Sequence, residues 1–247
     1  MPRLLLLLSS IAMPIVAWFS QRGAFGPTNG AISDQYPTLL VAAGYAFAIW
    51  GLIFTLDVIF GVVQATRSDR QSPELSGLRL PIAIGFALTA SWMIVFTQQA
   101  FWLALAIILG ALALMLYAAL QLSRRGASIR HLGWAWLPVS LHAGWLSLAA
   151  FLNVAQVIVA FKLFPVSDML PWSAALFVLA ACVLLLANRG MRGNWAYVAA
   201  AVWGLVAVYV KQSSAAMTGA SVAAWIALTI AVVLTAQCVW LLMRKTA

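Results

Sequence analysis

An aspartate and a histidine stand inside long apolar stretches of this sequence. Asp57 lies in FTLDVIF and His142 lies in VSLHAGW. A carboxyl group beside an imidazole can share a proton, form an ion pair, or act as an acid and a base. Because a lone charge in apolar surroundings is costly, we expect the two side chains to pair with each other. The alternative is a protonated Asp57 that is bonded to Thr55 or to a backbone carbonyl.

Tryptophans share a helical face with polar residues in three stretches. An indole recurs with polar companions at intervals of three, four or seven residues, which places them on one side of a helix. Aromatic walls with few polar groups suit a flat, mostly apolar ligand, although ordinary hydrogen bonding between helices explains the spacing equally well. The sets are Trp50, Phe54 and Asp57; Thr89, Trp92, Phe96 and Gln99; and His142, Trp145, Ala149, Asn153 and Gln156.

Catalytic and metal-binding motifs do not accompany these residues. The sequence has no HExxH, GxSxG or Walker A pattern, and its second histidine, His131, lies in the basic segment RRGASIRH. Cys182 and Cys238 lie in apolar runs without CxxC spacing, so neither a disulfide nor a metal site is expected. An enzyme that used Asp57 and His142 as acid and base would lack a nucleophile or a metal. We therefore expect no enzymatic activity and no metal site.

The elements that carry these residues are expected to be membrane-spanning helices. Hydrophobic residues make up 65% of the 247 residues and charged residues only 8%, which is typical of a multi-span membrane protein. A spanning helix needs about 20 mostly apolar residues, and no alternating pattern indicates a barrel. The sequence thus predicts an all-α integral membrane protein with about eight transmembrane helices, at roughly 4–20, 41–65, 79–98, 101–123, 134–161, 170–188, 194–210 and 220–242.

The basic residues predict the orientation of these helices. The formal net charge is +9, yet the basic residues lie at the ends of apolar segments. We therefore expect contact with anionic membrane lipid and no nucleic-acid partner. The positive-inside rule then predicts a multi-pass protein of a bacterial inner membrane, with both termini cytoplasmic. The inner set is Arg3, Arg67, Arg70, Arg79, Arg124, Arg125, Arg130, Arg189, Arg192, Arg244 and Lys245; the outer set is Arg22, Lys162 and Lys211.

Three segments resemble the TspO/MBR family of translocator proteins, which are also called tryptophan-rich sensory proteins. YPTLLVAAGYAFAIW (36–50) is similar to the family's loop and second helix, with Pro37 and Trp50 in register. TASWMIVFTQQAFW (89–102) is similar to the junction of its third and fourth helices. LPVSLHAGWLSLAAFLN (137–153) is similar to its fifth helix, with Trp145 and Asn153 in register. The chain departs from the family at Leu39, which replaces a loop tryptophan, and at Val41, Ala42 and His142.

The resemblance implies how the chain is divided and what it binds. It predicts a five-helix TspO-like bundle at 1–163, followed by three additional transmembrane helices at 164–247 that bury a dimer surface or hold another site. Family members bind tetrapyrroles, sterols and synthetic aromatic ligands inside the bundle. We therefore expect a sensory or translocator protein that binds a hydrophobic small molecule such as a haem, a porphyrin or a sterol, with no resident cofactor. The predicted ligand-binding residues are Tyr45, Trp50, Trp92, Trp145 and Asn153.

A different class of function stays open beside this one. Asp57 could serve as the coupling site of a secondary transporter or of a permease subunit. Inverted repeats would support that hypothesis, but the two halves of the sequence show no convincing similarity to each other. Uptake that depends on protons would favour a transporter, whereas saturable binding without flux would favour a sensor.

Overall fold

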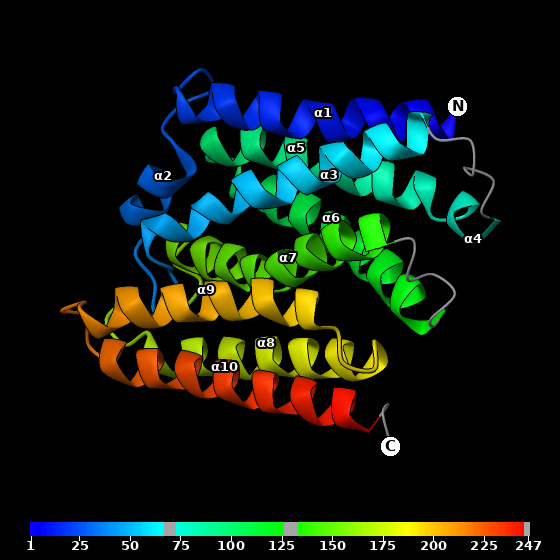
Figure 1. Ribbon diagram of the computed structural model, residues 1–247. Helices are drawn as coiled ribbons and strands as arrows, with labels where there is room; N and C mark the ends of the chain where they lie inside the picture. The colour runs from blue at the N-terminus through cyan, green and yellow to red at the C-terminus, as the bar shows by residue number, and fades with distance from the viewer. Residues whose placement is uncertain (67–72, 126–132, 245–247) are drawn as a thin grey trace.

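The computed structural model describes residues 1–66, 73–125 and 133–244, and within these ranges the chain is helical without strands (Figure 1). Short helices connect the long ones: α2 (Asn29–Gln35), the 3-10 helix η1 (Gly44–Ala48) and α4 (Pro73–Ser76). The long helices are α1 (Pro2–Gln21), α3 (Ile49–Thr66), α5 (Arg79–Thr97), α6 (Phe101–Arg124), α7 (Gly133–Ala160), α8 (Leu170–Gly190), α9 (Trp195–Ser213) and α10 (Ala220–Met243).

The eight long helices confirm the predicted spans. Counting η1 with α3, each of the eight contains 19–28 residues and is apolar enough to cross a membrane. The chain is therefore an integral, multi-pass membrane protein. The second span, expected at 41–65, starts later than predicted. Its helix begins at Gly44, and the backbone N–H of the preceding residue, Ala43, donates to the carbonyl of Ala207.

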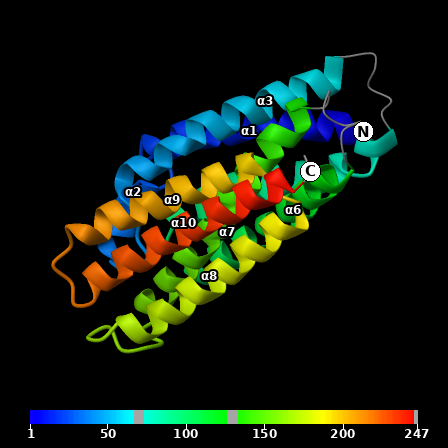
Figure 2. The ribbon, with the colours of Figure 1, turned by 60° about the horizontal axis from the view of Figure 1, so that its bottom comes forward.

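Helix α7 is the centre of the bundle, and α1 is its outermost layer on one side (Figures 1 and 2). Of the most apolar window of α7, 72% is buried, against 22% for α1. Helices α3, α6, α8 and α9 pack around α7, while α1 packs on α3 and α5, and α10 packs on α8 and α9. Polar side chains on α7 are therefore enclosed by protein, which is where the sequence pattern places its longest stripe.

Glycines set the closest helix contacts. A Cβ atom at Gly144 of α7 would collide with the carbonyl of Tyr197 on α9, so the two backbones touch. A Cβ at Gly61 of α3 would collide with the Ser10 hydroxyl of α1. The first contact fixes the three C-terminal helices against the bundle, and the second fixes the middle of α1 against the C-terminal part of α3.

The two termini lie at the same end of the molecule (Figure 1). The described basic residues of the predicted inner set lie at helix ends on that side, and the predicted outer set lies at the opposite side. Arg67, Arg70, Arg130, His131 and Lys245 lie outside the described residues. This distribution agrees with the charge pattern, while the direction of the bundle in a membrane stays a prediction.

Candidate functional site

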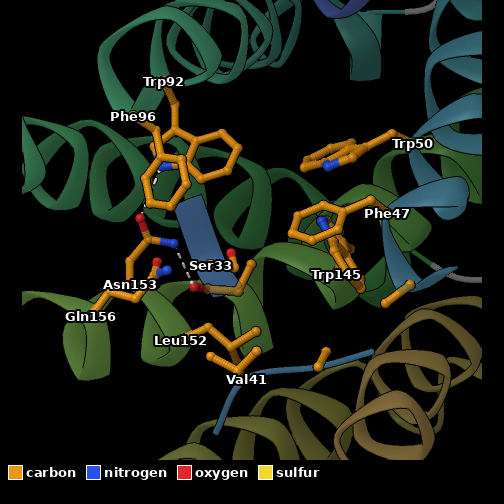
Figure 3. A pocket seen from close by; sticks show the side chains of 13 residues that line it. Ser33, Val41, Phe47, Trp50, Trp92, Phe96, Trp145, Leu152, Asn153 and Gln156 are labelled. Carbon is orange, nitrogen blue, oxygen red and sulfur yellow. Dashed lines mark hydrogen bonds between the residues drawn. The ribbon is translucent and has the colours of Figure 1, made fainter. Parts of the chain in front are cut away.

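A cavity lies between α7, α5 and the segment that leads into α3 (Figure 3). We call it the central cavity. Its lining is mostly aromatic and apolar, with a few amide and hydroxyl groups. The lining residues are Ser33, Val41, Ala42, Ala46, Phe47, Trp50, Trp92, Phe96, Trp145, Ala149, Leu152, Asn153 and Gln156.

Helix α7 supplies one wall of the central cavity. Five of its residues face the space, and they recur at three- and four-residue intervals along one side of the helix. The predicted stripe of His142, Trp145, Ala149, Asn153 and Gln156 forms this wall from Trp145 onward, with Leu152 added, whereas His142 does not line the cavity. On α5, Trp92 and Phe96 lie one turn apart and present their rings to the same space (Figure 3).

The aromatic rings form two groups on opposite sides of the cavity (Figure 3). Trp92 stacks on Phe96, with ring centroids 4.8 Å apart. Across the cavity, Trp50 meets Trp145 edge to face at 5.8 Å, and Phe47 meets Trp145 at 6.4 Å. Flat walls of this kind favour contact with a planar apolar molecule.

The hydrogen-bonding groups of the cavity are unevenly satisfied. The indole N–H of Trp92 donates to Oδ1 of Asn153 at 3.0 Å, and the Asn153 amide donates in turn to the carbonyl of Ala149 at 2.9 Å. By contrast, Trp50 Nε1, Trp145 Nε1 and Gln156 Nε2 are buried and find no partner among the described residues. All three atoms are donors, and a buried donor without an acceptor costs about 1–3 kcal/mol.

The space left inside the central cavity is small. A water molecule can occupy only about 30 Å³ of it. That is room for a water or two, whereas a site for a drug-sized ligand has roughly 300–1,000 Å³. Binding of a larger molecule must therefore displace lining side chains or the segment that carries Val41, Ala42 and Phe47.

Tyr45 is the predicted site residue that does not line the central cavity. Its side chain is 44% exposed and meets Trp203 edge to face at 5.4 Å. The residue lies in η1 and lines a larger cavity between α1 and α3 instead. The other four predicted residues, Trp50, Trp92, Trp145 and Asn153, all line the cavity.

Asp57 and His142 meet beside the cavity, one layer deeper in the bundle. His142 Nδ1 lies 2.8 Å from Asp57 Oδ2, and both side chains are fully buried. On its other side, His142 Nε2 lies 3.1 Å from the hydroxyl of Thr89. The imidazole stacks on Phe86 at 5.5 Å and meets the Trp50 ring at 5.7 Å. The pair is thus one aromatic ring away from the cavity.

The Thr89 hydroxyl has two possible partners for its single hydrogen: the carbonyl of Gly85 at 3.0 Å and Nε2 of His142 at 3.1 Å. When the hydroxyl donates to Gly85, it accepts from Nε2, and a further proton between Nδ1 and Asp57 makes the pair neutral overall. A neutral pair avoids the cost of an isolated buried charge. Thr55 is not a partner of Asp57, because its hydroxyl donates to the carbonyl of Gly51.

Residues 3–240 match the family described as TSPO-like protein. The chain belongs to this family. The match runs through all eight long helices, including α8, α9 and α10. No curated protein and no solved structure matches the chain. The division of this TSPO-like chain at residue 163 stays a prediction.

In this TSPO-like protein, α9 holds the segment that closes the central cavity. The Gln212 amide donates to the carbonyls of Thr38 and Val41 at 3.1 and 3.0 Å. The indole of Trp203 donates to the carbonyl of Ala46 at 3.0 Å. Leu39, which replaces the loop tryptophan noted in the sequence comparison, is fully buried and does not line the cavity.

Sequence reasoning missed several residues of this TSPO-like site. Phe47 and Ser33 line the cavity but lie outside the regular helical stripes. Gln99 follows the α5 stripe, yet it lies beyond the end of that helix and accepts from the Tyr36 hydroxyl at 2.8 Å. The clearest signal that could have found Gln212 is its polarity near the end of an apolar span.

Proposed function

We propose that this TSPO-type membrane protein binds a hydrophobic aromatic ligand in the central cavity and senses or translocates it. The observation that carries the proposal is the set of buried donors without partners at Trp50, Trp145 and Gln156, inside an otherwise aromatic lining. A ligand that offers acceptors to these donors would recover hydrogen bonds worth about 0.5–1.5 kcal/mol each. Apolar contact with the rings supplies the rest of the affinity.

The donors define the chemistry of the ligand. Carbonyl, carboxylate or ether oxygens would satisfy indole and amide N–H groups, and a flat apolar body would lie between the Trp92 and Trp145 walls. A porphyrin combines a planar ring with carboxylates, and a sterol offers a single hydroxyl on an apolar body. The porphyrin therefore fits this donor set better than the sterol does.

Haem would bind here through its ring and carboxylates and not through its iron. His142 does not line the cavity, and both of its ring nitrogens already have partners. Among the described residues, no group of three or more His, Cys, Asp or Glu side chains could hold a metal. We accordingly propose that haem and metal-free protoporphyrin bind with similar affinity, and that the protein has no resident cofactor.

Entry of such a ligand requires the cavity to widen. The segment 38–48 is the element best suited to move. It is held by hydrogen bonds from α9 side chains to its carbonyls and not by the regular packing of one long helix on another. Opening would cost those bonds, and ligand contacts would offset the cost. If only a fraction of the molecules is open, the apparent Kd for the ligand equals the intrinsic Kd divided by that fraction.

The test is a titration of the purified protein with protoporphyrin, haem, a sterol and pyrene, followed by quenching of tryptophan fluorescence. Pyrene is the matched control because it is flat and aromatic but has no hydrogen-bond acceptor. We expect saturable quenching by both porphyrins at similar concentrations, and at least severalfold weaker binding of pyrene. Equal affinity for pyrene would refute the role of the donors, and no saturable binding of any probe would refute the proposal.

A secondary transporter is the second candidate, and the Asp57–His142 pair is the observation that favours it. Asp57 Oδ1 finds no hydrogen-bond partner in the described part of the chain, so the carboxyl could accept a proton or bond elsewhere after a rearrangement. Its complete burial argues against a coupling role in this conformation. Uptake of protoporphyrin into proteoliposomes under an imposed proton gradient separates the two candidates, because only the transporter requires flux.

We propose that the protein is not an enzyme. Thr89, His142 and Asp57 form a hydroxyl–imidazole–carboxyl series, but the carbonyl of Gly85 competes with the imidazole for the hydroxyl hydrogen. A nucleophile must give its hydrogen to the base, so this arrangement does not activate Thr89. None of the three side chains lines the central cavity, where a substrate would lie.

We also propose that the protein lies in a bacterial inner membrane with both termini in the cytoplasm. This proposal rests on the distribution of basic residues alone.

A further inference from the structure

A second and larger cavity lies on the outside of the bundle, between α1 and α3. We call it the α1–α3 groove, and its volume is about 830 Å³. It begins where the two helices separate. They touch at Ser10 and Gly61, and beyond that contact α1 diverges toward its C-terminal end, so that Pro14, Ala17 and Trp18 face the open space.

The groove is apolar along α3 and polar at one end. Phe54, Val58 and Ile59 line its wall on α3. At the end where α1 finishes and α2 starts, it is lined by Ser20 and Asn29. Their side chains are 1% and 3% exposed, and Ser20 Oγ and Asn29 Oδ1 have no hydrogen-bond partner among the residues that the structure describes. Buried oxygens of this kind are normally paired, so they point to a ligand with polar groups at this end.

A positive charge stands beside the same end. The guanidinium of Arg22 lies 3.8 Å from the ring centroid of Trp18, which lines the groove. The polar end is also the end of a spanning helix, where a tryptophan and an arginine are expected at the level of the lipid head groups. An apolar channel that starts at this level matches the dimensions and polarity of a lipid.

We propose that the α1–α3 groove is a binding site for an anionic phospholipid with a hydroxylated head group, such as phosphatidylglycerol. One acyl chain lies along Phe54 and Ile59. The phosphate lies near Arg22, and head-group hydroxyls donate to Asn29 Oδ1 and accept from Ser20. The lipid site is separate from the central cavity, and Phe47 and Trp50 form the partition because they line both spaces.

The chain offers a variant that fills the groove without disturbing the fold. Gly51 lines the groove on α3, and a Cβ atom there meets nothing within 4 Å. Gly51→Leu therefore places a side chain in the space of the acyl chain and adds a better helix former. Gly133→Leu is the matched control, because Gly133 also has open space around its Cβ position and lines neither cavity.

Native mass spectrometry of the full chain in non-ionic detergent, with equal amounts of phosphatidylglycerol and phosphatidylcholine, tests the proposal. We expect wild type and Gly133→Leu to retain one phosphatidylglycerol, and Gly51→Leu to lose at least three-quarters of it. Arg22→Gln should lower retention of phosphatidylglycerol and leave phosphatidylcholine unchanged. Equal retention of the two lipids by wild type, or equal retention by the two glycine variants, would overturn the proposal.

A thermal-shift series gives a second measurement in case Gly51→Leu is poorly folded. Added phosphatidylglycerol should raise the Tm of wild type and Gly133→Leu, and should raise that of Asn29→Leu and Arg22→Gln much less. An equal rise in all four proteins would also overturn the proposal. Porphyrin binding in the central cavity is measured separately, so failure of one site does not imply failure of the other.

Discussion

His142 and Asp57 join α7 to α3 through a hydrogen bond of 2.8 Å that is fully enclosed by protein. The two residues are 85 positions apart in the chain, and the contact holds the central helix against the helix that carries Trp50. Because Trp50 touches the imidazole and also lines the central cavity, the pair supports the floor of the proposed ligand site.

A double-mutant cycle of Asp57→Asn and His142→Gln should show that the two residues act together. Each single change leaves a buried polar group without its partner, which costs about 1–3 kcal/mol. The double variant should lose less than the sum, with a coupling energy of about 0.5–3 kcal/mol. Thermal unfolding in detergent measures all four proteins. Strict additivity would contradict a direct interaction.

Replacing Trp145 should weaken ligand binding more than replacing a tryptophan at the membrane interface. Trp145→Ala removes a stacking ring and an unpaired donor, with a loss of about 0.5–1.5 kcal/mol beyond the buried area. That corresponds to roughly a two- to twelvefold rise in the Kd for protoporphyrin. Trp240→Phe is the control, because Trp240 is half exposed and lies under the Arg244 guanidinium, far from the cavity lining. Equal effects of the two changes would place the ligand elsewhere.

The sequence predicts those features that depend on local periodicity. Hydropathy alone located the eight spans to within a few residues, because a bilayer demands an apolar run of a set length. The stripe of Trp145, Asn153 and Gln156 indicated a face that the structure turns into a cavity wall. The cost of a lone charge in apolar surroundings was enough to suggest that Asp57 and His142 meet.

Features that depend on contacts between distant segments could not be predicted in this way. Trp203 and Ala46 are 157 positions apart, and no spacing within either helix indicates that they bond. Tyr45 was predicted as a ligand-binding residue in a span expected at 41–65, whereas it lies in the 3-10 helix η1 that precedes α3. The packing of α9 against the segment 38–48 is a tertiary contact that no local sequence pattern indicates.

Gly144→Ala should destabilise the protein, because the added methyl group would meet the backbone of Tyr197. Backbone cannot rotate away as a side chain can, so we expect a cost of about 1–3 kcal/mol from overpacking between α7 and α9. Gly51→Ala is the control, since its Cβ position is open and alanine favours helix. Chemical unfolding in detergent compares the two. A Gly144 variant as stable as the Gly51 variant would show that α7 and α9 are less closely packed.

Removing the bonds from α9 should loosen the segment that closes the central cavity. Gln212→Leu loses the donors to the carbonyls of Thr38 and Val41, and the Thr38 carbonyl then keeps only the N–H of Val41 at 3.3 Å. We expect hydrogen exchange at residues 38–48 to rise about tenfold or more, which corresponds to a loss of about 1.4 kcal/mol in local stability. Trp225→Phe on exposed α10 is the control. Unchanged exchange in the Gln212 variant would mean that other contacts hold the segment.

The orientation of the bundle can be tested at two exposed positions on opposite ends. Ala24 follows α1 on the side of Arg22, and Gly77 precedes α5 on the side of the termini. In a background with Cys182→Ser, we expect an impermeant maleimide to label Ala24→Cys in intact cells, and to label Gly77→Cys only after the cells are permeabilised. The physical reason is the excess of Arg and Lys on the side of the termini, which is retained in the cytoplasm during insertion. Labelling of Gly77→Cys alone in intact cells would reverse the proposed orientation and would place the lipid groove's polar end in the inner leaflet.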